Sequence, residues 1–258
     1  MRVIQRSENV VDLGAGPTSC TSPTEHRAVV NANLTDVAVV IPALNEEESI
    51  PMVMADMPKV GAVFVVDNGS DDNTALVAER AGATVLRAPS RGYGNACKVG
   101  IREAARQDFG VIVILDGDHS FDPQELVKLV HPITADRADM VLGDRTELAD
   151  PGALQPQQRV GNWVATRLIH AISGHQYSDM GPFRAIRTSA LLALDMEDPN
   201  FGWNVEMQLK ALKHGLRVHE VAVHCRNRAA GESKISGSIR ASLRCGVHMI
   251  AATWRYGR

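Results

Sequence analysis

The chain has 258 residues, of which 45% are hydrophobic, enough for one large α/β domain with a continuous core. Its formal net charge is -3, so it lacks the strongly cationic character of nucleic-acid-binding proteins, and no nucleic-acid partner is expected. Its four cysteines are widely spaced and form no C-x-x-C pair, which argues against a disulfide framework or a zinc site and fits a reducing cytoplasm. No apolar stretch is long enough for a signal-peptide core or for a spanning helix of roughly 20 residues, so any membrane contact is expected to be peripheral.

Residues 1–34 mix small, polar and charged residues without periodicity, which predicts a flexible leader. From residue 37 onward, short β-branched runs alternate with helical stretches, a pattern typical of a parallel βαβ sheet. The expected buried parallel strands are Val37–Ile41, Val63–Val66, Thr84–Leu86, Val111–Leu115 and Met140–Leu142. The expected helices between them begin near Ser49, near Asp72 or Asn73, and at Gly94.

The later segment, roughly residues 145–235, is predicted to complete the side of the molecule that binds an acceptor substrate. Its patterns indicate helices over 159–173 and 204–214 and strands over 182–186 and 218–224.

Polar residues follow three of the predicted strands, at the point where each strand ends. These segments are Pro42-Ala43-Leu44-Asn45-Glu46, Asp67-Asn68-Gly69-Ser70 and Asp116-Gly117-Asp118-His119. In open α/β sheets ligands bind beyond the carboxyl ends of the strands, so the three segments are expected to converge on one acidic rim.

Asp116 and Asp118 are the strongest candidates for chemistry on this rim. Two carboxylates on a loop after a buried strand can hold a hard cation, which would bridge a diphosphate. The alternative is a turn in which Asp and Gly only satisfy local hydrogen bonds.

The other polar segments are weaker signals when each is taken alone. The acids at 46–48, which follow Asn45, suit the positive N-terminal end of a helix, and the segment 67–72 resembles a turn followed by a helix cap. The segment Arg91-Gly92-Tyr93-Gly94-Asn95 could offer backbone N–H groups to an anion, but it lacks the full dinucleotide fingerprint.

Together, the order and the residues of these motifs resemble those of the family 2 glycosyltransferases of GT-A fold, over about residues 37–238. The resemblance implies an α/β fold with a Rossmann-like, mostly parallel central sheet flanked by helices, in a single domain over 35–236. A narrower resemblance, to dolichyl-phosphate mannose synthase and bacterial polyprenyl-phosphate sugar transferases, lies in the segments 179–187 and 228–236.

The resemblance also implies roles for individual residues. Base and ribose would be held by Pro42, Ala43, Asn45, Glu46, Asp67 and Asn68, while Asp116, Gly117 and Asp118 would serve ribose, diphosphate and a divalent metal, Mg²⁺ or Mn²⁺. The acceptor phosphate would lie near Arg145, Arg228, Ser233 and Lys234. Asn68 stands where the family often has a second Asp, and Ser120 stands where the synthases often carry a metal-contacting Gln.

The family mechanism implies inversion at the anomeric carbon, and the acceptor decides whether a base is needed. A phosphate oxygen is already anionic, whereas an alcohol must lose a proton to a group within hydrogen-bond reach. Asp179 and Glu206 are the candidate bases. Alternatively, Asp179 orients Arg184, and Glu206 is an acid favoured early in a helix.

The C-terminal segment, 237–258, is predicted to form a basic amphipathic helix. Every charged residue after Glu232 is basic, and an apolar stripe recurs at helical spacing: Ile239, Leu243, Val247, Ile250 and Trp254. Such a stripe can lie on a bilayer with anionic headgroups, or it can pack on the protein's own core or on another subunit.

The sequence therefore predicts an inverting glycosyltransferase, with a UDP- or GDP-sugar as donor and a phosphate-bearing lipid such as polyprenyl phosphate as acceptor. It would act in the cytoplasm, with the inner face of the membrane as its expected place of contact. The alternatives are the same donor chemistry with a small soluble acceptor, and a non-catalytic nucleotide-sugar-binding module.

Overall fold

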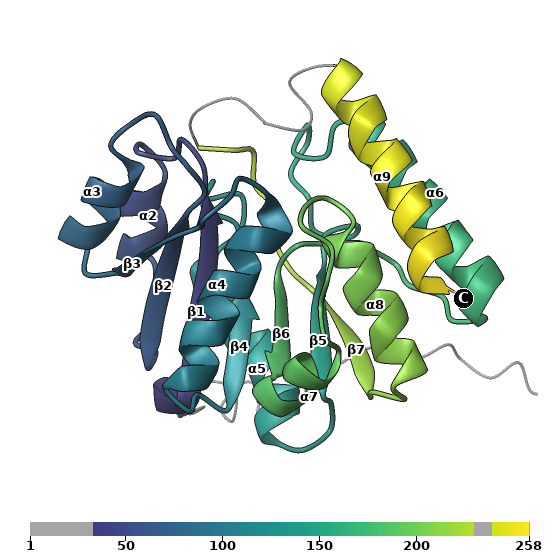
Figure 1. Cartoon of the computed structure of the whole chain (residues 1–258), viewed down its shortest axis with the longest axis horizontal. Helices are drawn as coiled ribbons and strands as arrows, with labels where there is room; N and C mark the ends of the chain where they lie inside the picture. The colour runs from purple at the N-terminus through teal and green to yellow at the C-terminus, as the bar shows by residue number, and fades with distance from the viewer. Residues whose placement is uncertain (1–32, 230–238, 258) are drawn as a thin grey trace, which may run out of the picture.

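The computed structural model describes residues 33–229 and 239–257 (Figure 1). The predicted leader lies outside the described residues except for its last two positions. Ser233 and Lys234 also lie outside them, so their predicted role at the acceptor phosphate stays a prediction.

A seven-stranded sheet forms the centre of the molecule, in the order β3-β2-β1-β4-β6-β5-β7. The strands are β1 (Val37–Ala43), β2 (Ala62–Asp67), β3 (Thr84–Arg87), β4 (Val111–Ile114), β5 (Met140–Asp144), β6 (Arg184–Arg187) and β7 (Val218–Ala222). Neighbouring strands are parallel except at β6, which runs antiparallel to both β4 and β5. All five predicted parallel strands therefore form and point the same way, and the fold is the expected mostly parallel α/β sheet.

The helices cover both faces of this sheet (Figure 1). They are the short 3-10 turns η1 (Leu34–Asp36) and η2 (Pro123–Glu125), and the helices α2 (Ile50–Ala55), α3 (Thr74–Arg80), α4 (Tyr93–Arg106), α5 (Leu126–Thr134), α6 (Pro156–Ser173), α7 (Thr188–Ala193), α8 (Trp203–Lys213) and α9 (Ile239–Gly257). Alternation along the strands produces two cores, because successive side chains point to opposite faces. In β1, Val39 and Ile41 pack toward α2, α3 and α5, whereas Ala38 and Val40 pack toward α4 and α8.

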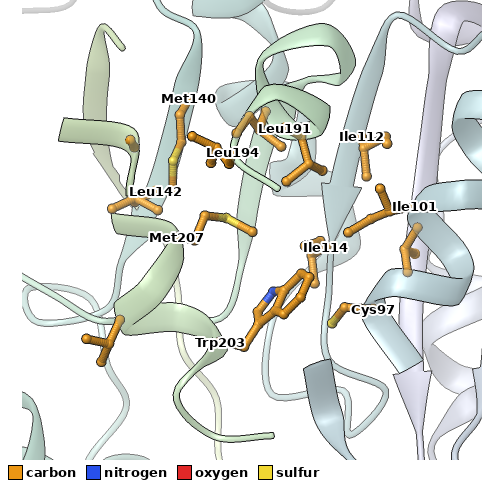
Figure 2. Packing of buried hydrophobic residues seen from close by; sticks show 14 of the residues in the cluster. Cys97, Ile101, Ile112, Ile114, Met140, Leu142, Leu191, Leu194, Trp203 and Met207 are labelled. Atoms are coloured by element: carbon orange, nitrogen blue, oxygen red, sulfur yellow. The ribbon is translucent and has the colours of Figure 1, made fainter. Parts of the chain in front are cut away.

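The second of these cores contains the largest fully buried side chain, Trp203. Figure 2 shows Trp203 of α8 beside Cys97 of α4 and Ile114 of β4. This packing holds the N-terminal turns of α4 and α8 close together. A Cβ atom on Gly94 would lie 2.9 Å from the Trp203 ring, so the close approach depends on glycine there.

The structure differs from the sequence expectations at three elements, β3, α5 and α7. The prediction that Thr84–Leu86 is buried was wrong, because β3 is an edge strand whose Thr84 and Arg87 are exposed. The helices α5 and α7 were not predicted. In α5, Pro132 interrupts a pattern that would otherwise indicate a helix, yet here it lies inside the helix near its C-terminal end.

The C-terminal helix α9 lies beside α6 and α8 (Figure 1). It packs against them through Ala252, Thr253 and Tyr256, which are buried. Two members of the predicted apolar stripe face outward instead, since Ile250 is 41% and Trp254 62% exposed. Among the described residues, no helix combines the length and the apolar character needed to cross a bilayer.

Candidate active site

The loops that follow β1 and β2 bond to each other at the carboxyl edge of the sheet. The backbone N–H of Glu46 donates to Thr74 Oγ1 at 2.8 Å, and that of Glu47 donates to Asp72 Oδ2 at 3.2 Å. In return, Asn45 Oδ1 accepts from the backbone N–H of Asp71 at 2.8 Å. Glu47 Oε2 also accepts from the backbone N–H and the side chain of Asn73, each at 3.0 Å, so side chains of both segments join the two loops.

A cavity of about 490 Å³ opens above the carboxyl ends of the strands. The three predicted segments contribute Pro42, Ala43, Glu46, Asn68, Asp116, Gly117 and Asp118 to its walls, and Arg145 and Arg228 line it from the predicted acceptor side. The structure thus brings these nine candidates to one place. Asn45 and Asp67 do not line it: Asp67 Oδ1 accepts from the backbone N–H of Ser70 at 2.9 Å and fixes the turn.

Asp116 and Asp118 stand on the loop after β4, separated by a buried glycine. A Cβ atom on Gly117 would lie 3.0 Å from Ile50 and 3.3 Å from Ile41, so this position packs tightly onto the core below. Asp118 Oδ1 accepts from the Ser120 hydroxyl at 2.6 Å and from the Ser120 N–H at 3.0 Å. Burial, and then the charge of Asp118, raise the pKa of Asp116 above its usual range.

Arg228 links the first loop to the third. One nitrogen of its guanidinium lies 3.0 Å from Glu46 Oε1, and the other lies 3.0 Å from Asp118 Oδ2. Glu46 is only 8% exposed, and its burial raises its pKa while Ser49 and Arg228 oppose the rise. Arg228 therefore places a shared positive charge between two carboxylates of the cavity.

Arg145 and Asp179 form a buried, forked ion pair. The guanidinium donates to Asp179 Oδ2 at 2.7 Å and to Oδ1 at 2.8 Å, and the Arg145 backbone N–H also donates to Oδ2 at 3.0 Å. Although burial opposes its charge, Asp179 holds the pKa of Arg145 above its usual value. The alternative role of Asp179, orienting Arg184, is not what the structure shows, because the Arg184 guanidinium donates to the carbonyls of Gly181 and Pro182.

Glu206, the other candidate base, is fully buried in the first turns of α8 and does not line the cavity. Its two carboxylate oxygens accept from the backbone N–H groups of Glu197 and Asp198, each at 2.7 Å. Lys210 lies 2.7 Å from the same carboxylate. These contacts tie α8 to the loop before it.

The segment 91–95 begins α4, as expected, but its N–H groups are partly occupied. Gly92 donates to Asn68 Oδ1 at 2.8 Å, and Asn95 donates to the Pro199 carbonyl at 3.1 Å. The side chain of Tyr93 faces the cavity and its hydroxyl lies 3.4 Å from Asp116 Oδ1. Sequence reasoning singled out this segment for its backbone and missed the tyrosine side chain.

Helices α6, α8 and α9 supply a wall that the sequence motifs did not indicate. Asn162 of α6, Asn204 of α8 and Met249 of α9 line the cavity together with Met180 and Phe201. No local motif marks these residues, because they meet the strand-end loops only through packing of helices distant in the chain.

The residues present fit a divalent cation that also binds phosphate oxygens. Across the described ranges, 33–229 and 239–257, no group of three or more His, Cys, Asp and Glu side chains could hold a metal alone. Asp116 and Asp118 instead would supply two hard oxygen ligands. This is the usual arrangement for Mg²⁺-type ions, which take one or two carboxylates and complete their shell with substrate phosphates and water.

Comparisons with known proteins agree with this geometry. The family model described as Glycosyl transferase family 2 matches residues 38–194. An uncharacterized glycosyltransferase of Mycobacterium tuberculosis is 40% identical over 211 residues, covering 80% of this chain and 93% of that protein. The undecaprenyl-phosphate mannosyltransferase of Micrococcus luteus is 30% identical over 225 residues, covering 79% of this chain and 88% of that protein.

Among solved structures, glucosyl-3-phosphoglycerate synthase from Mycobacterium tuberculosis has the same fold. Its complex with Mn²⁺, UDP-glucose and phosphoglyceric acid aligns with a TM-score of 0.68 and 22% identity, over 86% of this chain and 79% of that one. From the family match, the close relatives and the shared fold, this chain belongs to glycosyltransferase family 2 and has the GT-A architecture.

Proposed function

We propose that this glycosyltransferase moves a sugar, with inversion, from a UDP- or GDP-sugar to a phosphate-bearing lipid such as polyprenyl phosphate. The undecaprenyl-phosphate mannosyltransferase of Micrococcus luteus, at 30% identity, supports a lipid phosphate acceptor. The observation that carries the proposal lies in the site itself. Arginines line the cavity beside the carboxylate pair, while both candidate bases are engaged by other groups.

A phosphate nucleophile suits a cavity whose two candidate bases, Asp179 and Glu206, are both engaged elsewhere. Asp179 is held by three donor contacts from Arg145, and Glu206 is held outside the cavity by two backbone N–H groups and Lys210. An alcohol acceptor would need one of them to leave these contacts and accept a proton. A phosphate oxygen needs neither, since it is already an anion.

The arginines give this anion its recognition. Arg145 and Arg228 line the cavity, and guanidinium N–H groups are suited to phosphate oxygens. Asp179 holds the Nε and Nη2 atoms of Arg145, so its remaining N–H groups would face the phosphate, and Arg228 would exchange a carboxylate contact for the phosphate. Asp179 holds Arg145 in place, so in this proposal it positions the acceptor site rather than removing a proton. Ser233 and Lys234 follow Arg228 in the chain and remain predicted partners of the same phosphate.

The charges of the cavity also explain why a metal would be required for the donor. Glu46, Asp116 and Asp118 face the cavity and have one shared cation, Arg228, while Arg91 pairs with Asp71 and Arg145 with Asp179 beside it. A diphosphate would meet an excess of negative charge there. A Mg²⁺ or Mn²⁺ ion on Asp116 and Asp118 would offset that charge and stabilise the diphosphate as it leaves.

The transfer is then a single displacement. The acceptor phosphate oxygen forms a bond to the anomeric carbon on the face opposite the diphosphate, and the bond from that carbon to the diphosphate oxygen breaks. Pro42, Ala43 and Asn68 hold the nucleoside at one end of the cavity, where Asp116 would bind the ribose and the metal. Arg145 and Arg228 hold the acceptor phosphate in line at the other end.

We also place the enzyme against the inner face of a membrane, through α6 and α9. Both helices line the cavity, and they carry exposed apolar side chains: Val160 at 61%, Trp163 at 60%, Ile250 at 41% and Trp254 at 62%. Arg167 lies over the Trp163 ring, 5.7 Å from its centroid. Tryptophan and arginine together suit an anionic headgroup layer, from which a lipid phosphate could reach the cavity.

The direct test is transfer of radiolabelled sugar from UDP- and GDP-sugars to polyprenyl phosphate in the presence of Mn²⁺. Labelled lipid is the expected product. Labelling of a small alcohol with no labelled lipid would favour the soluble-acceptor alternative. The solved neighbour is in complex with a small molecule of this kind, phosphoglyceric acid. Nucleotide binding with neither transfer nor donor hydrolysis would favour a non-catalytic binding module.

A further inference from the structure

One polar group on the cavity wall has no partner and no assigned task. Asn204 is the second residue of α8 and lines the cavity that holds Asp116 and Asp118. Its Oδ1 atom is buried and makes no hydrogen bond to any of the residues that the structure describes. Buried polar groups are nearly always hydrogen-bonded, so an unpaired one in a ligand cavity indicates a bond made to the ligand.

The neighbouring asparagine on this wall shows the contrast. Asn162 of α6 uses both ends of its amide, because Oδ1 accepts from the Met180 N–H at 2.7 Å and Nδ2 donates to the Ser178 carbonyl at 3.2 Å. Asn162 thus fixes the protein's own backbone, whereas the Oδ1 of Asn204 is unpaired on a residue of the cavity wall, where a turn of the side chain would bring it to a ligand.

The position of Asn204 is fixed by several contacts around the start of α8. The Pro199 carbonyl accepts from the Asn95 N–H, and Asp198 Oδ1 accepts from the Asn200 N–H at 2.8 Å. Gly92 passes so close to the Pro199 carbonyl that no Cβ atom would fit between them. The wall bearing Asn204 is therefore held against the loop that precedes α4, on the donor side of the cavity.

The chemistry of the carboxamide group limits what it can recognise. Its oxygen accepts a hydrogen bond, so this atom suits a hydroxyl and not an ionised phosphate or an apolar lipid chain, whereas its NH2 end donates. The proposed donor has hydroxyls on its ribose and on its transferred sugar, and Asp116 is the residue assigned to the ribose. A hydroxyl both donates and accepts, so it could bond to either end of the Asn204 amide.

Building on the proposed function, we infer that Asn204 binds a hydroxyl of the transferred sugar and helps to select that sugar. It would recognise the hexose moiety while contributing nothing to the nucleoside diphosphate. The inference thus adds a sugar-selecting residue to the donor site.

The test compares Asn204→Ala and Asn204→Leu with the wild type by calorimetric titration with Mn²⁺. The probes are UDP, GDP, UDP-glucose and GDP-mannose. We expect binding of the preferred sugar nucleotide to weaken by about tenfold, the usual effect of one lost hydrogen bond in a dry site, while its nucleoside diphosphate binds as before. The melting temperature of the ligand-free variants should stay the same or rise, since the atom removed was unpaired.

A matched control is Thr188→Val on α7, which removes another buried, unpartnered oxygen that does not line the cavity. It should change neither titration. Equal weakening of nucleotide and sugar nucleotide in the Asn204 variants, or a lower melting temperature without ligand, would overturn the inference and indicate a nucleotide contact or a structural role. Unchanged binding of the sugar nucleotide would overturn it too, and if no probe bound the wild type the proposed function would fall with it.

Discussion

Arg228 lies within 3.0 Å of Asp118, so the loop after β7 is joined by a charge pair to the loop after β4. The same guanidinium reaches Glu46 on the loop after β1. One cation thus connects the predicted nucleotide loop, the predicted metal loop and the predicted acceptor loop.

Replacing Arg228 by Ala should impair transfer to polyprenyl phosphate while leaving donor binding with Mn²⁺ in place. A charge-assisted contact contributes about 1.5–3 kcal/mol, so the loss should be tenfold or more in rate or in acceptor affinity. Steady-state transfer assays beside titration of the sugar nucleotide would separate the two effects. Arg226→Ala is the matched control, because Arg226 stands in the same loop but pairs with Asp122 at 2.6 Å. Equal transfer by both variants would remove Arg228 from the acceptor site.

Asp118→Asn should keep the fold and lose turnover. Asparagine preserves the shape of the side chain and one acceptor oxygen for Ser120, and Arg228 keeps its pair with Glu46, so the melting temperature should fall only slightly. The metal, however, would lose a charged ligand. Excess EDTA should reproduce the loss in the wild-type enzyme, and added Mn²⁺ should reverse it there but not in the variant. Full turnover in EDTA would refute metal dependence.

The two candidate bases provide a sharper test of the acceptor. If phosphate is the nucleophile, Asp179→Asn should act mainly on stability, because removing one partner of a buried ion pair costs about 3–5 kcal/mol. Thermal melts should show a large fall, and activity per folded molecule should survive at reduced acceptor affinity. Replacing both partners, as Asp179→Leu with Arg145→Met, should recover part of the stability.

Glu206→Gln should behave in the same way, with a lower melting temperature and retained chemistry, since the carboxylate holds two backbone N–H groups outside the cavity. Loss of kcat in a variant that melts like the wild type would instead identify that residue as a general base and an alcohol as the acceptor.

The sequence revealed the strand-end loops because each motif directly follows a buried run, as Asp116 follows Val111–Ile114. It did not reveal that β6 is antiparallel to its neighbours, since the residues of a short strand do not indicate which way the strand runs in the sheet. The wall formed by Asn162 and Asn204 was hidden for a related reason. It depends on how α6 and α8 pack over the sheet, and no local pattern encodes that contact.

Side-chain substitutions on α6 and α9 can test the proposed membrane contact. Removing α9 would expose the core that Ala252 and Tyr256 cover, whereas Trp163→Ala with Trp254→Ala changes only side chains that are 60% and 62% exposed. The double variant should melt like the wild type and bind anionic liposomes less in sedimentation assays, because tryptophan favours the headgroup layer. Added salt should weaken wild-type binding by screening.

The comparison for this experiment is a double variant elsewhere on the surface, Leu76→Ala with Leu192→Ala, whose side chains are 42% and 51% exposed. It removes exposed apolar area from α3 and α7. If it lowered liposome binding as much as the tryptophan variant, the contact would not be specific to α6 and α9.

Acid should weaken the link between β5 and β7. Asp139, just before β5, accepts from the Arg217 guanidinium and backbone just before β7, and these contacts, with hydrogen bonding as the largest cause, lower its pKa to about 2. A carboxylate whose pKa is lower in the folded state than in the unfolded chain stabilises the fold fully above the unfolded value, near 3.9, and loses that contribution as the pH falls toward 2. Because Arg217 is about half exposed, solvent screening limits the contribution to about 1 kcal/mol.

Asp139→Asn should therefore melt a few degrees below the wild type at pH 6, and the two melting temperatures should converge as the pH approaches 2. Denaturant unfolding at several pH values gives the same comparison if heating is irreversible. A difference that stayed constant across this range would mean that Asp139 acts through packing rather than through its charge.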